Sequence, residues 1–385
     1  MPENFKDKFS HTSITHMGRV IEQNLSDFPT QKFINLATHN LDDLAMKARS
    51  QQIVDALIAT LPKDFTKAGS ALVNSLQPIS EETTADPNTA GWTNNLVTSN
   101  TTGIGSWLIM PAADFIGQQG QHNVPFAMEC LHAMTKRFSA EFGVRHLLKA
   151  EPKQTLTILD SWCKDPCQHV RRLVSEGSRP LLPWGIRLQS FLDDPAHTLP
   201  LLEKLKNDPS NYVRLSVANH LNDIAKQHPD IINALTEKWQ QPTNKQRTKL
   251  LKHACRTLIK QGNRDTLALW GYTPGDFALT LTLSTKNVLM GDSIEMNVTV
   301  HNPLPKQQNI LLDYVVYQQK ANGQLAPRVC KWKTCVIKPQ QTLTLHKKHS
   351  FKPVTTRKYY PGKHQMALQI NGVIYPAETF YLTIT

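Results

Sequence analysis

The sequence predicts a mainly α-helical protein, in which a HEAT-like helical-repeat solenoid is followed by a C-terminal β-sandwich of immunoglobulin type. Two observations support this fold class. Up to about residue 271, apolar residues recur at intervals of three and four positions, which is helical periodicity. After that point, short runs alternate between apolar and polar residues, and about seven such strands in roughly 110 residues fit an immunoglobulin-like sandwich.

The helical part contains an internal repeat. DPCQHVRR at 165 and DPSNYVRL at 208 share Asp-Pro-x-x-x-Val-Arg, and a weaker copy, QPTNKQRT at 241, keeps Pro242 and Arg247. A spacing of about 40 residues between paired helices is typical of HEAT-like repeats. We expect Asp or Ser to cap the second helix of each pair and proline to stand in its first turn. Stacked pairs form a curved solenoid whose second helices line the concave face.

The helical stretches with the clearest periodicity are HMGRVIEQNL (16–25), MKARSQQIVDALIATL (46–61) and LLKHACRTLIKQG (250–262). We place the helical domain at residues 1–271, the hinge at GYTPGD (271–276) and the β-sandwich at 275–385. The loop-rich stretch 75–96 is expected to be a mobile excursion. The strands of the second domain are expected in FALTLTLS (277–284), SIEMNVTVHN (293–302), ILLDYVVYQQ (310–319), TLTLHKKHSF (342–351) and TFYLTIT (379–385).

The charge balance favours a polyanionic partner. The chain has 43 Lys and Arg against 31 Asp and Glu, a net charge of +12, which favours nucleic acid first and a membrane surface second. Residues 275–385 hold 13 of the cations and five of the acids. Their basic stretches contain Trp332, Tyr359 and Tyr360, a combination that suits a nucleic-acid backbone. We expect this domain to clamp a DNA duplex opposite the solenoid; the alternative is a solubilising or packing module.

Several function classes lack their sequence signals. No run of eighteen apolar residues is present, and the polar start MPENFKDKFS is unlike a secretory signal, so we expect a protein of the bacterial cytoplasm, associated with the nucleoid through DNA, with no membrane contact. Six cysteines in 385 residues do not make a disulfide framework, and Cys163-x3-Cys167 lacks a second ligand pair for zinc. We expect reduced thiols, no metal, no cofactor and a monomer.

The helix after DPCQ has one apolar and one charged side. At 100° per residue, its apolar side holds Val170, Leu173, Val174 and Gly177. The other side carries Arg172, Glu176 and Arg179, at i, i+4 and i+7, and we expect it to face outward onto the concave surface. The simpler interpretation is a solvated face whose ion pairs contribute a few tenths of a kcal/mol each.

Two neighbouring stretches carry similar stripes. Arg137, Glu141 and Arg145 are spaced at i, i+4 and i+8 in KRFSAEFGVRHLL. SVANHLNDIAK contributes Asn219, Asp223 and Lys226. If the repeats stack, the three stripes lie on consecutive helices of one surface, and Trp184 follows Pro180 and Pro183 at its edge.

Carboxylates among arginines with a tryptophan suit the removal of an alkylated base. A 3-methylpurine is already cationic, so its glycosidic bond needs no strong general acid. It needs carboxylates that stabilise an oxocarbenium-like transition state and position water, and an aromatic face that attracts the cationic base. Arginines would hold the phosphates around the lesion.

The stretches RFSAEFGVRHLL, DPCQHVRRLVSEGSRPLLPWGIRL and SVANHLNDIAKQHPD resemble the DNA alkylation repair glycosylases of the AlkC/AlkD superfamily, specifically the AlkC branch. The resemblance covers most of residues 1–270. It implies a HEAT-like solenoid that excises cationic N3-alkylated bases without flipping them, and some AlkC proteins carry a C-terminal immunoglobulin-like domain.

The resemblance also implies residue roles. Glu141 and Glu176 would be the catalytic carboxylates and Trp184 would contact the lesion. The residues expected to contact DNA are Arg145, Arg172, Arg179, Arg214, Asn219, Asp223 and Lys226. The expected function is a monofunctional DNA glycosylase that excises 3-methyladenine and 3-methylcytosine from duplex DNA in base excision repair. Two alternatives stay open: a non-catalytic HEAT-like scaffold that binds DNA structures or a protein partner, and a protein-binding solenoid with no nucleic-acid role.

Overall fold

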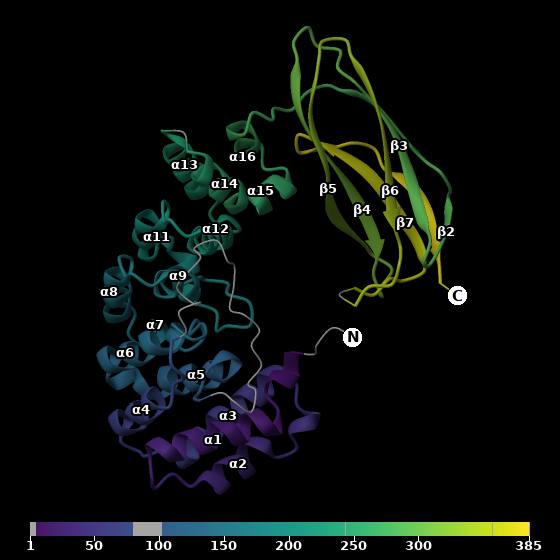
Figure 1. The fold of residues 1–385 in the computed structure, drawn as a ribbon. Helices are drawn as coiled ribbons and strands as arrows, with labels where there is room; N and C mark the ends of the chain where they lie inside the picture. The colour runs from purple at the N-terminus through teal and green to yellow at the C-terminus, as the bar shows by residue number, and fades with distance from the viewer. Residues whose placement is uncertain (1–4, 80–101, 243, 356, 385) are drawn as a thin grey trace. The chain divides into compact units, whose positions relative to one another are not determined.

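A computed structural model describes the chain apart from residues 1–4, 80–101, 243, 356 and 385 (Figure 1). Most of the stretch 75–96 therefore lies outside the described residues. The α-helices are α1 (His11–Asn24), α2 (Thr30–Thr38), α3 (Met46–Thr60), α4 (Phe65–Asn74), α5 (Ile109–Gln119), α6 (Val124–Thr135), α7 (Val144–Ala150), α8 (Pro152–Trp162), α9 (Gln168–Gly177), α10 (Gln189–Asp193), α11 (Leu199–Leu205), α12 (Asn211–Ala225), α13 (Pro229–Gln240), α14 (Lys245–Ala254), α15 (Arg256–Gln261) and α16 (Arg264–Leu269). Short 3-10 helices lie at Phe5–Lys8, Leu41–Asp43, Ser106–Leu108, Gly120–His122 and Pro195–His197.

The helices stack through the apolar sides that the sequence predicts. In α9, the side chains of Val170, Leu173 and Val174 are completely buried. Helix α9 packs against α8 and α12, and α12 in turn packs against α14. The same helix–helix contacts recur along the chain, as expected of a helical-repeat protein.

The arginine of each repeat has a structural role. Nη1 of Arg171 donates to the carbonyl of Pro166 (3.0 Å), and Nη1 of Arg214 donates to that of Pro209 (2.8 Å). In the third copy, Arg247 donates to the carbonyl of Pro242. The arginine therefore folds back on the turn that precedes its own helix, which explains why it recurs with the proline.

The aspartates of the repeat fix the same turns. Oδ1 of Asp165 accepts from the backbone N–H of Cys167 (2.7 Å), and Oδ1 of Asp208 accepts from that of Ser210 (2.8 Å). The expected proline in the first helical turn is wrong, because both prolines lie before the helix. Ser210 stands at the N-cap of α12 as expected, but neither α9 nor α12 has a side-chain cap hydrogen bond. Asp208 also receives Nε of Arg171 at 2.6 Å and so joins consecutive repeats.

The C-terminal strands form two facing sheets. They are β1 (Ala278–Leu283), β2 (Asn287–Leu289), β3 (Ser293–His301), β4 (Gln308–Gln319), β5 (Leu325–Ile337), β6 (Thr342–Ser350), β7 (Gly362–Ile370), β8 (Val373–Ile374) and β9 (Glu378–Thr383). One sheet has the order β1-β3-β6 and the other β2-β9-β7-β4-β5, with β8 paired to β7. On β3, alternate residues enter the shared core: Ile294, Met296, Val298 and Val300. The predicted fold class, a helical-repeat part followed by an immunoglobulin-like sandwich, is confirmed.

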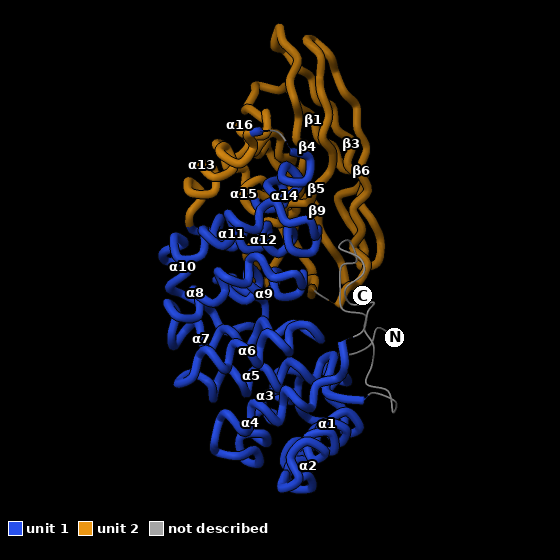
Figure 2. The backbone as a smooth tube through the Cα atoms, turned by 60° about the vertical axis from the view of Figure 1, so that its left-hand side comes forward, with its two compact units in different colours: residues 1–227, 242–254 blue, residues 228–241, 255–385 orange. Residues whose placement is uncertain are grey.

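The chain divides into two compact units that differ from the predicted boundary (Figure 2). One unit comprises residues 1–227 and 242–254, and the other comprises residues 228–241 and 255–385. Helices α13, α15 and α16 thus belong with the sandwich. Within that unit, Nδ2 of Asn371 donates to the carbonyl of Thr273 (2.7 Å), and Nε2 of Gln369 donates to that of Lys260 (3.3 Å). These bonds attach the sandwich to the helices that precede it.

Candidate functional site

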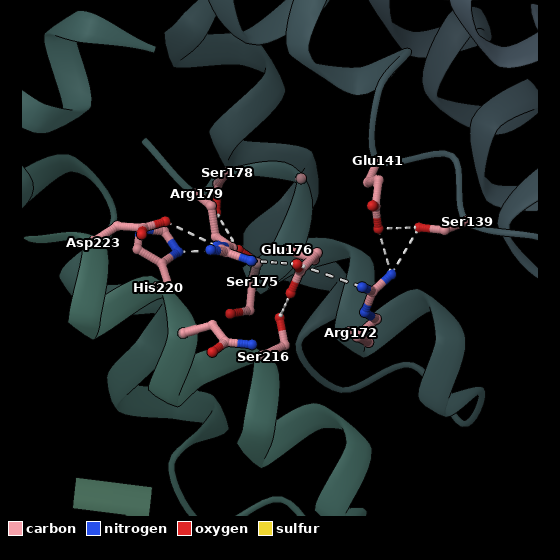
Figure 3. Close-up of polar contacts among 12 residues, drawn as sticks. Ser139, Glu141, Arg172, Ser175, Glu176, Ser178, Arg179, Ser216, His220 and Asp223 are labelled. Atoms are coloured by element: carbon pink, nitrogen blue, oxygen red, sulfur yellow. Dashed lines mark hydrogen bonds and ion pairs between the residues drawn. The ribbon is translucent and has the colours of Figure 1, made fainter. Parts of the chain in front are cut away.

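Six side chains of alternating charge form a continuous series across three segments of the first unit, and Figure 3 labels the five from Glu141 to Asp223. We call this series the ion-pair chain. Its members, in spatial order, are Glu141, Arg172, Glu176, Arg179, Asp223 and Lys226. The chain joins the turn before α7 to α9 and α12, three segments that the sequence predicted to share one surface.

Glu141 lies at one end of the ion-pair chain. Its Oε2 accepts a hydrogen bond from Oγ of Ser139 at 2.6 Å and contacts Nη1 of Arg172 at 2.5 Å. The guanidinium of Arg172 also lies 5.0 Å from the ring centre of Tyr212, a cation–π contact. Burial alone would lower the pKa of Arg172, but the carboxylates of Glu141 and Glu176 outweigh burial and raise it. Arg172 therefore stays cationic.

Glu176 lies at the centre, with both carboxylate oxygens engaged. Oε1 is 2.6 Å from Nη1 of Arg179 and 3.5 Å from Nη2 of Arg172, and Oε2 accepts from Oγ of Ser216 at 2.6 Å. Burial alone would raise the pKa of Glu176, but the two guanidiniums and the Ser216 hydroxyl lower it below the ordinary value. The carboxylate is held ionised in a position shielded from water.

Asp223 and Lys226 form the other end. Oδ2 of Asp223 accepts from Nε of Arg179 at 2.9 Å, and its Oδ1 is 3.1 Å from Nζ of Lys226. The side chain of Asp223 is 2% exposed whereas that of Lys226 is 40% exposed. The ion-pair chain is therefore most buried at Glu176, Arg179 and Asp223 and ends at a solvent-accessible ammonium.

His220 packs beside the ion-pair chain in a neutral form. Its Nδ1 lies 3.0 Å from the carbonyl of Ser175 and its Nε2 lies 3.2 Å from Oγ1 of Thr198. Complete burial lowers the pKa of His220 to about 4. The imidazole is therefore uncharged at neutral pH and links α12 to the neighbouring segments by hydrogen bonds.

Trp184 lies in the segment between α9 and α10. The backbone N–H of Gly185 donates to the carbonyl of Leu182 at 3.2 Å, which places Pro183 and Trp184 at the centre of a turn. Trp184 has φ = 66°, a left-handed conformation that this turn position normally reserves for glycine or asparagine. Half of its surface is exposed. The strained backbone therefore presents a large aromatic ring to solvent.

The expected outward-facing stripe on α9 is wrong. Glu176 and Arg179 are 5% and 7% exposed, because their partners come from α12 and cover them. The expectation that Arg137, Glu141 and Arg145 form a stripe along one helix is also wrong. Helix α6 ends at Thr135 and α7 begins at Val144, so the three residues do not share a helix. Glu141 lies in the intervening turn and still reaches Arg172.

Three residues expected to contact DNA have internal partners. The guanidinium of Arg145 is fully buried and donates to the carbonyls of Gly177, Arg179 and Ile186. Arg214 is the repeat arginine described above and is 7% exposed. Asn219 lies outside the ion-pair chain, with its Oδ1 2.9 Å from Nε2 of His253 on α14. Buried guanidiniums committed to carbonyls have no path to a phosphate, so Arg145 and Arg214 are corrected to structural roles.

The serines of this site were missed by sequence reasoning. Ser139 and Ser216 each donate to a carboxylate of the ion-pair chain. A signal for Ser139 existed, because it stands two residues before Glu141 in the stretch used for the resemblance. No local signal existed for Ser216, whose partner lies 40 positions away in the sequence.

Neither a metal site nor a membrane span is found in the described part of the chain. No group of three or more His, Cys, Asp or Glu side chains there is arranged to hold a metal ion. No helix among the described residues is both long and apolar enough to cross a bilayer. All six cysteines are free thiols.

A helical-repeat unit with a buried ion-pair chain, joined to an immunoglobulin-like sandwich, defines the class of this protein. Residues 278–384 match the family described as "Uncharacterised protein YhaZ, C-terminal Ig-like domain". "Uncharacterized protein YhaZ" of Bacillus subtilis (strain 168) is 31% identical over 374 residues, which cover 96% of this chain and 97% of that relative.

A solved structure is similar over the whole chain. It is described as Pseudomonas fluorescens alkylpurine DNA glycosylase AlkC bound to DNA containing an abasic site analog, and it covers 99% of this chain and 100% of its own. The TM-score is 0.85 and the identity 29%. The chain belongs to the family of YhaZ and AlkC, the AlkC branch of the AlkC/AlkD superfamily.

Proposed function

We propose that this protein is a monofunctional DNA glycosylase that removes cationic N3-alkylated bases, 3-methyladenine and 3-methylcytosine, from duplex DNA without flipping the base. The observation that carries the proposal is the placement of Glu141, on an ion-pair chain of a protein similar to AlkC over its full length. AlkC of Pseudomonas fluorescens is an alkylpurine DNA glycosylase whose structure contains DNA with an abasic site analog.

The chemistry asks little of a general acid. An N3-alkylated base carries a positive charge, so it leaves as a neutral base once the glycosidic bond breaks. The barrier lies in the cationic sugar, and a fixed carboxylate stabilises this charge most when water is excluded. Water then adds to the sugar carbon, and a carboxylate that accepts its proton completes the hydrolysis.

Glu141 suits the water-directed role better than Glu176. Both oxygens of Glu176 are committed to Arg172, Arg179 and Ser216. In the described part of the chain, Glu141 contacts Ser139 and Arg172, and both contacts use the same oxygen, Oε2. Oε1 of Glu141 is the carboxylate oxygen left to bind water. We therefore assign Glu176 to hold the two arginines and Glu141 to hold the water.

The remaining residues of the proposal would contact either the damaged base or the DNA backbone. Trp184 offers its half-exposed ring to the cationic base, an attraction worth about 0.5–2 kcal/mol. Lys226 is the exposed cation of the ion-pair chain and a candidate phosphate contact. The proposed nucleophile is water held by Glu141, and Nζ of Lys226 pairs with Asp223.

The sandwich is proposed to bind the DNA backbone. Lys333 on β5 and Lys348 on β6 are exposed cations of edge strands in the two sheets. Tyr359, by contrast, is 5% exposed and packs against Phe351, so it belongs to the core. Backbone phosphates are the polyanion that such strands would attract.

Base release from duplex DNA with a single N3-methyladenine tests the proposal. We expect release by the wild type and a loss of at least about 100-fold in both Glu141→Gln and Glu176→Gln, with DNA binding kept. Glu129→Gln, at an exposed glutamate of α6, is the matched control and should retain full activity. Absence of release by the wild type, with binding intact, would favour the non-catalytic scaffold.

A second outcome separates the two glutamates. Glu141→Gln is expected to lower the rate while leaving the melting temperature within a few degrees. Glu176→Gln is expected to lower both, because it removes a charge that two buried arginines share. Equal release by Glu141→Gln and the wild type would contradict the assignment of the water to Glu141.

A further inference from the structure

The segment that carries Trp184 has few internal backbone hydrogen bonds. It connects α9 to α10 and includes Pro180 and Pro183, which have no N–H to donate. Between residues 180 and 188, two backbone hydrogen bonds are internal, from Gly185 to Leu182 and from Leu188 to Pro180, each 3.2 Å. The backbone of Trp184 is strained, because its φ of 66° lies in the left-handed region. Contacts from residues outside the segment must therefore stabilise its conformation.

Arg145 on α7 supplies that support. Its Nη1 donates to the carbonyl of Gly177 at 2.8 Å and to that of Arg179 at 2.7 Å, where the segment leaves α9. Its Nε donates to the carbonyl of Ile186 at 2.6 Å, and Nη2 donates to the same carbonyl, beyond Trp184. One planar guanidinium thus ties together the two ends of the segment.

The packing around Arg145 reaches the neighbour of Trp184. A Cβ atom built on Gly185 would lie 3.0 Å from Nε of Arg145 and 3.0 Å from Cδ2 of Leu182. Gly185 therefore packs directly against the guanidinium of Arg145. Burial lowers the pKa of Arg145 to about 10, so the side chain remains cationic at neutral pH and keeps all of its donors.

We infer that Arg145 is a positioning residue for Trp184. Its buried guanidinium joins the carbonyls of Gly177 and Arg179, before the tryptophan, to that of Ile186, after it, and so holds the strained turn that presents the indole. This role rests on the proposed function, in which Trp184 meets the lesion. A lysine at 145 keeps the charge but has a single nitrogen in place of the planar fork, so it cannot bridge the same three carbonyls. A methionine removes both the charge and the donors.

Hydrogen exchange tests the structural half of this inference without any activity. We expect Arg145→Lys to accelerate exchange of the amides of Gly185 and Leu188 by about tenfold, and Arg145→Met by more, while amides of α12 keep their protection. If Arg145→Met fails to fold, Gly185→Ala disturbs the same contact and should accelerate the same two amides. Unchanged exchange at these amides in Arg145→Lys and Gly185→Ala would overturn the inference.

A double-mutant cycle tests the functional half. Arg145→Lys should lower base release about tenfold in the wild-type background and less than about twofold in a Trp184→Ala background. A tenfold loss in both backgrounds would show that Arg145 acts independently of Trp184 and would overturn the positioning role. No release by the wild type would instead refute the proposed function, and the exchange experiment would still decide whether Arg145 holds the segment.

Discussion

Nε of Arg179 lies 2.9 Å from Oδ2 of Asp223, a residue 44 positions further along the chain. This bond joins the end of α9 to the last turns of α12, and both side chains are almost completely buried. Through Glu176 and Arg172, the same series continues to Glu141. The position of each carboxylate in the candidate site therefore depends on its neighbours in the ion-pair chain.

Removing Asp223 should be costly. Asp223→Ala leaves Arg179 with one carboxylate in a buried position, and breaking a buried pair in this way costs about 3–5 kcal/mol. Chemical denaturation of both proteins measures the loss. Asp160→Ala breaks the exposed pair with Lys204 and is the control, and its cost should be much smaller because water and salt screen exposed charges. Equal losses would contradict a buried network that contributes to stability.

Stability should fall in mildly acidic solution because of His220. Its pKa is lowered from 6.5 to about 4, so the unfolded chain binds a proton first as the pH falls. The contribution of the neutral His220 to the free energy of unfolding is about 3 kcal/mol. It is complete above pH 6.5 and is lost as the pH falls from 6.5 to about 4.

Comparison with His220→Asn isolates this contribution. The asparagine keeps a donor for the carbonyl of Ser175, and the charged groups that face residue 220 (Glu176, Arg179 and Asp223) are unchanged. The difference in unfolding free energy between the two proteins should shrink from pH 7 to pH 4.5. A difference independent of pH would refute the neutral, buried histidine.

The backbone at residue 184 should prefer glycine. Trp184→Gly and Trp184→Ala both remove the indole, but only alanine keeps the strain of a positive φ angle. We expect the glycine variant to be about 1 kcal/mol more stable than the alanine variant, as measured by thermal unfolding. Both should lower base release by about 2- to 30-fold, because neither has an aromatic ring to attract the cationic base. A less stable glycine variant would contradict the left-handed turn.

Salt dependence should distinguish structural from DNA-binding cations. Lys333→Ala is expected to weaken DNA binding and to lower the slope of log affinity against log salt by about 0.9 if the lysine contacts one phosphate. Arg214→Ala should destabilise the protein, since it removes the support of the turn at Pro209, and leave that slope unchanged. The opposite pattern would restore Arg214 as a DNA contact. Point substitutions are preferable to deletion of 275–385, because Asn371 bonds to Thr273 outside that range.

Much of the fold follows from the sequence because its signals are local. The spacing of Val170, Leu173 and Val174 predicts both a helix and its buried side, and the alternation from Ile294 to Val300 predicts a strand with one face in the core. Arg171 and Arg214 recur at equal distances after Asp-Pro, which reveals the repeat. The stretch from Ser175 to Trp184 was distinctive enough to indicate the family.

The environment of the candidate site was decided by the tertiary structure. A helical wheel places Arg172, Glu176 and Arg179 away from the apolar side, but it cannot show that Asp223 and Ser216 of α12 cover them. Arg145 likewise appears in the sequence as one more cation, and only the return of the segment after α9 brings three carbonyls around it. Hydrophobic periodicity is a property of neighbouring residues, so the sequence by itself determined the helices, the strands and the repeat. An ion pair depends on atoms a few ångströms apart on different helices, and that distance exists only after the helices have packed.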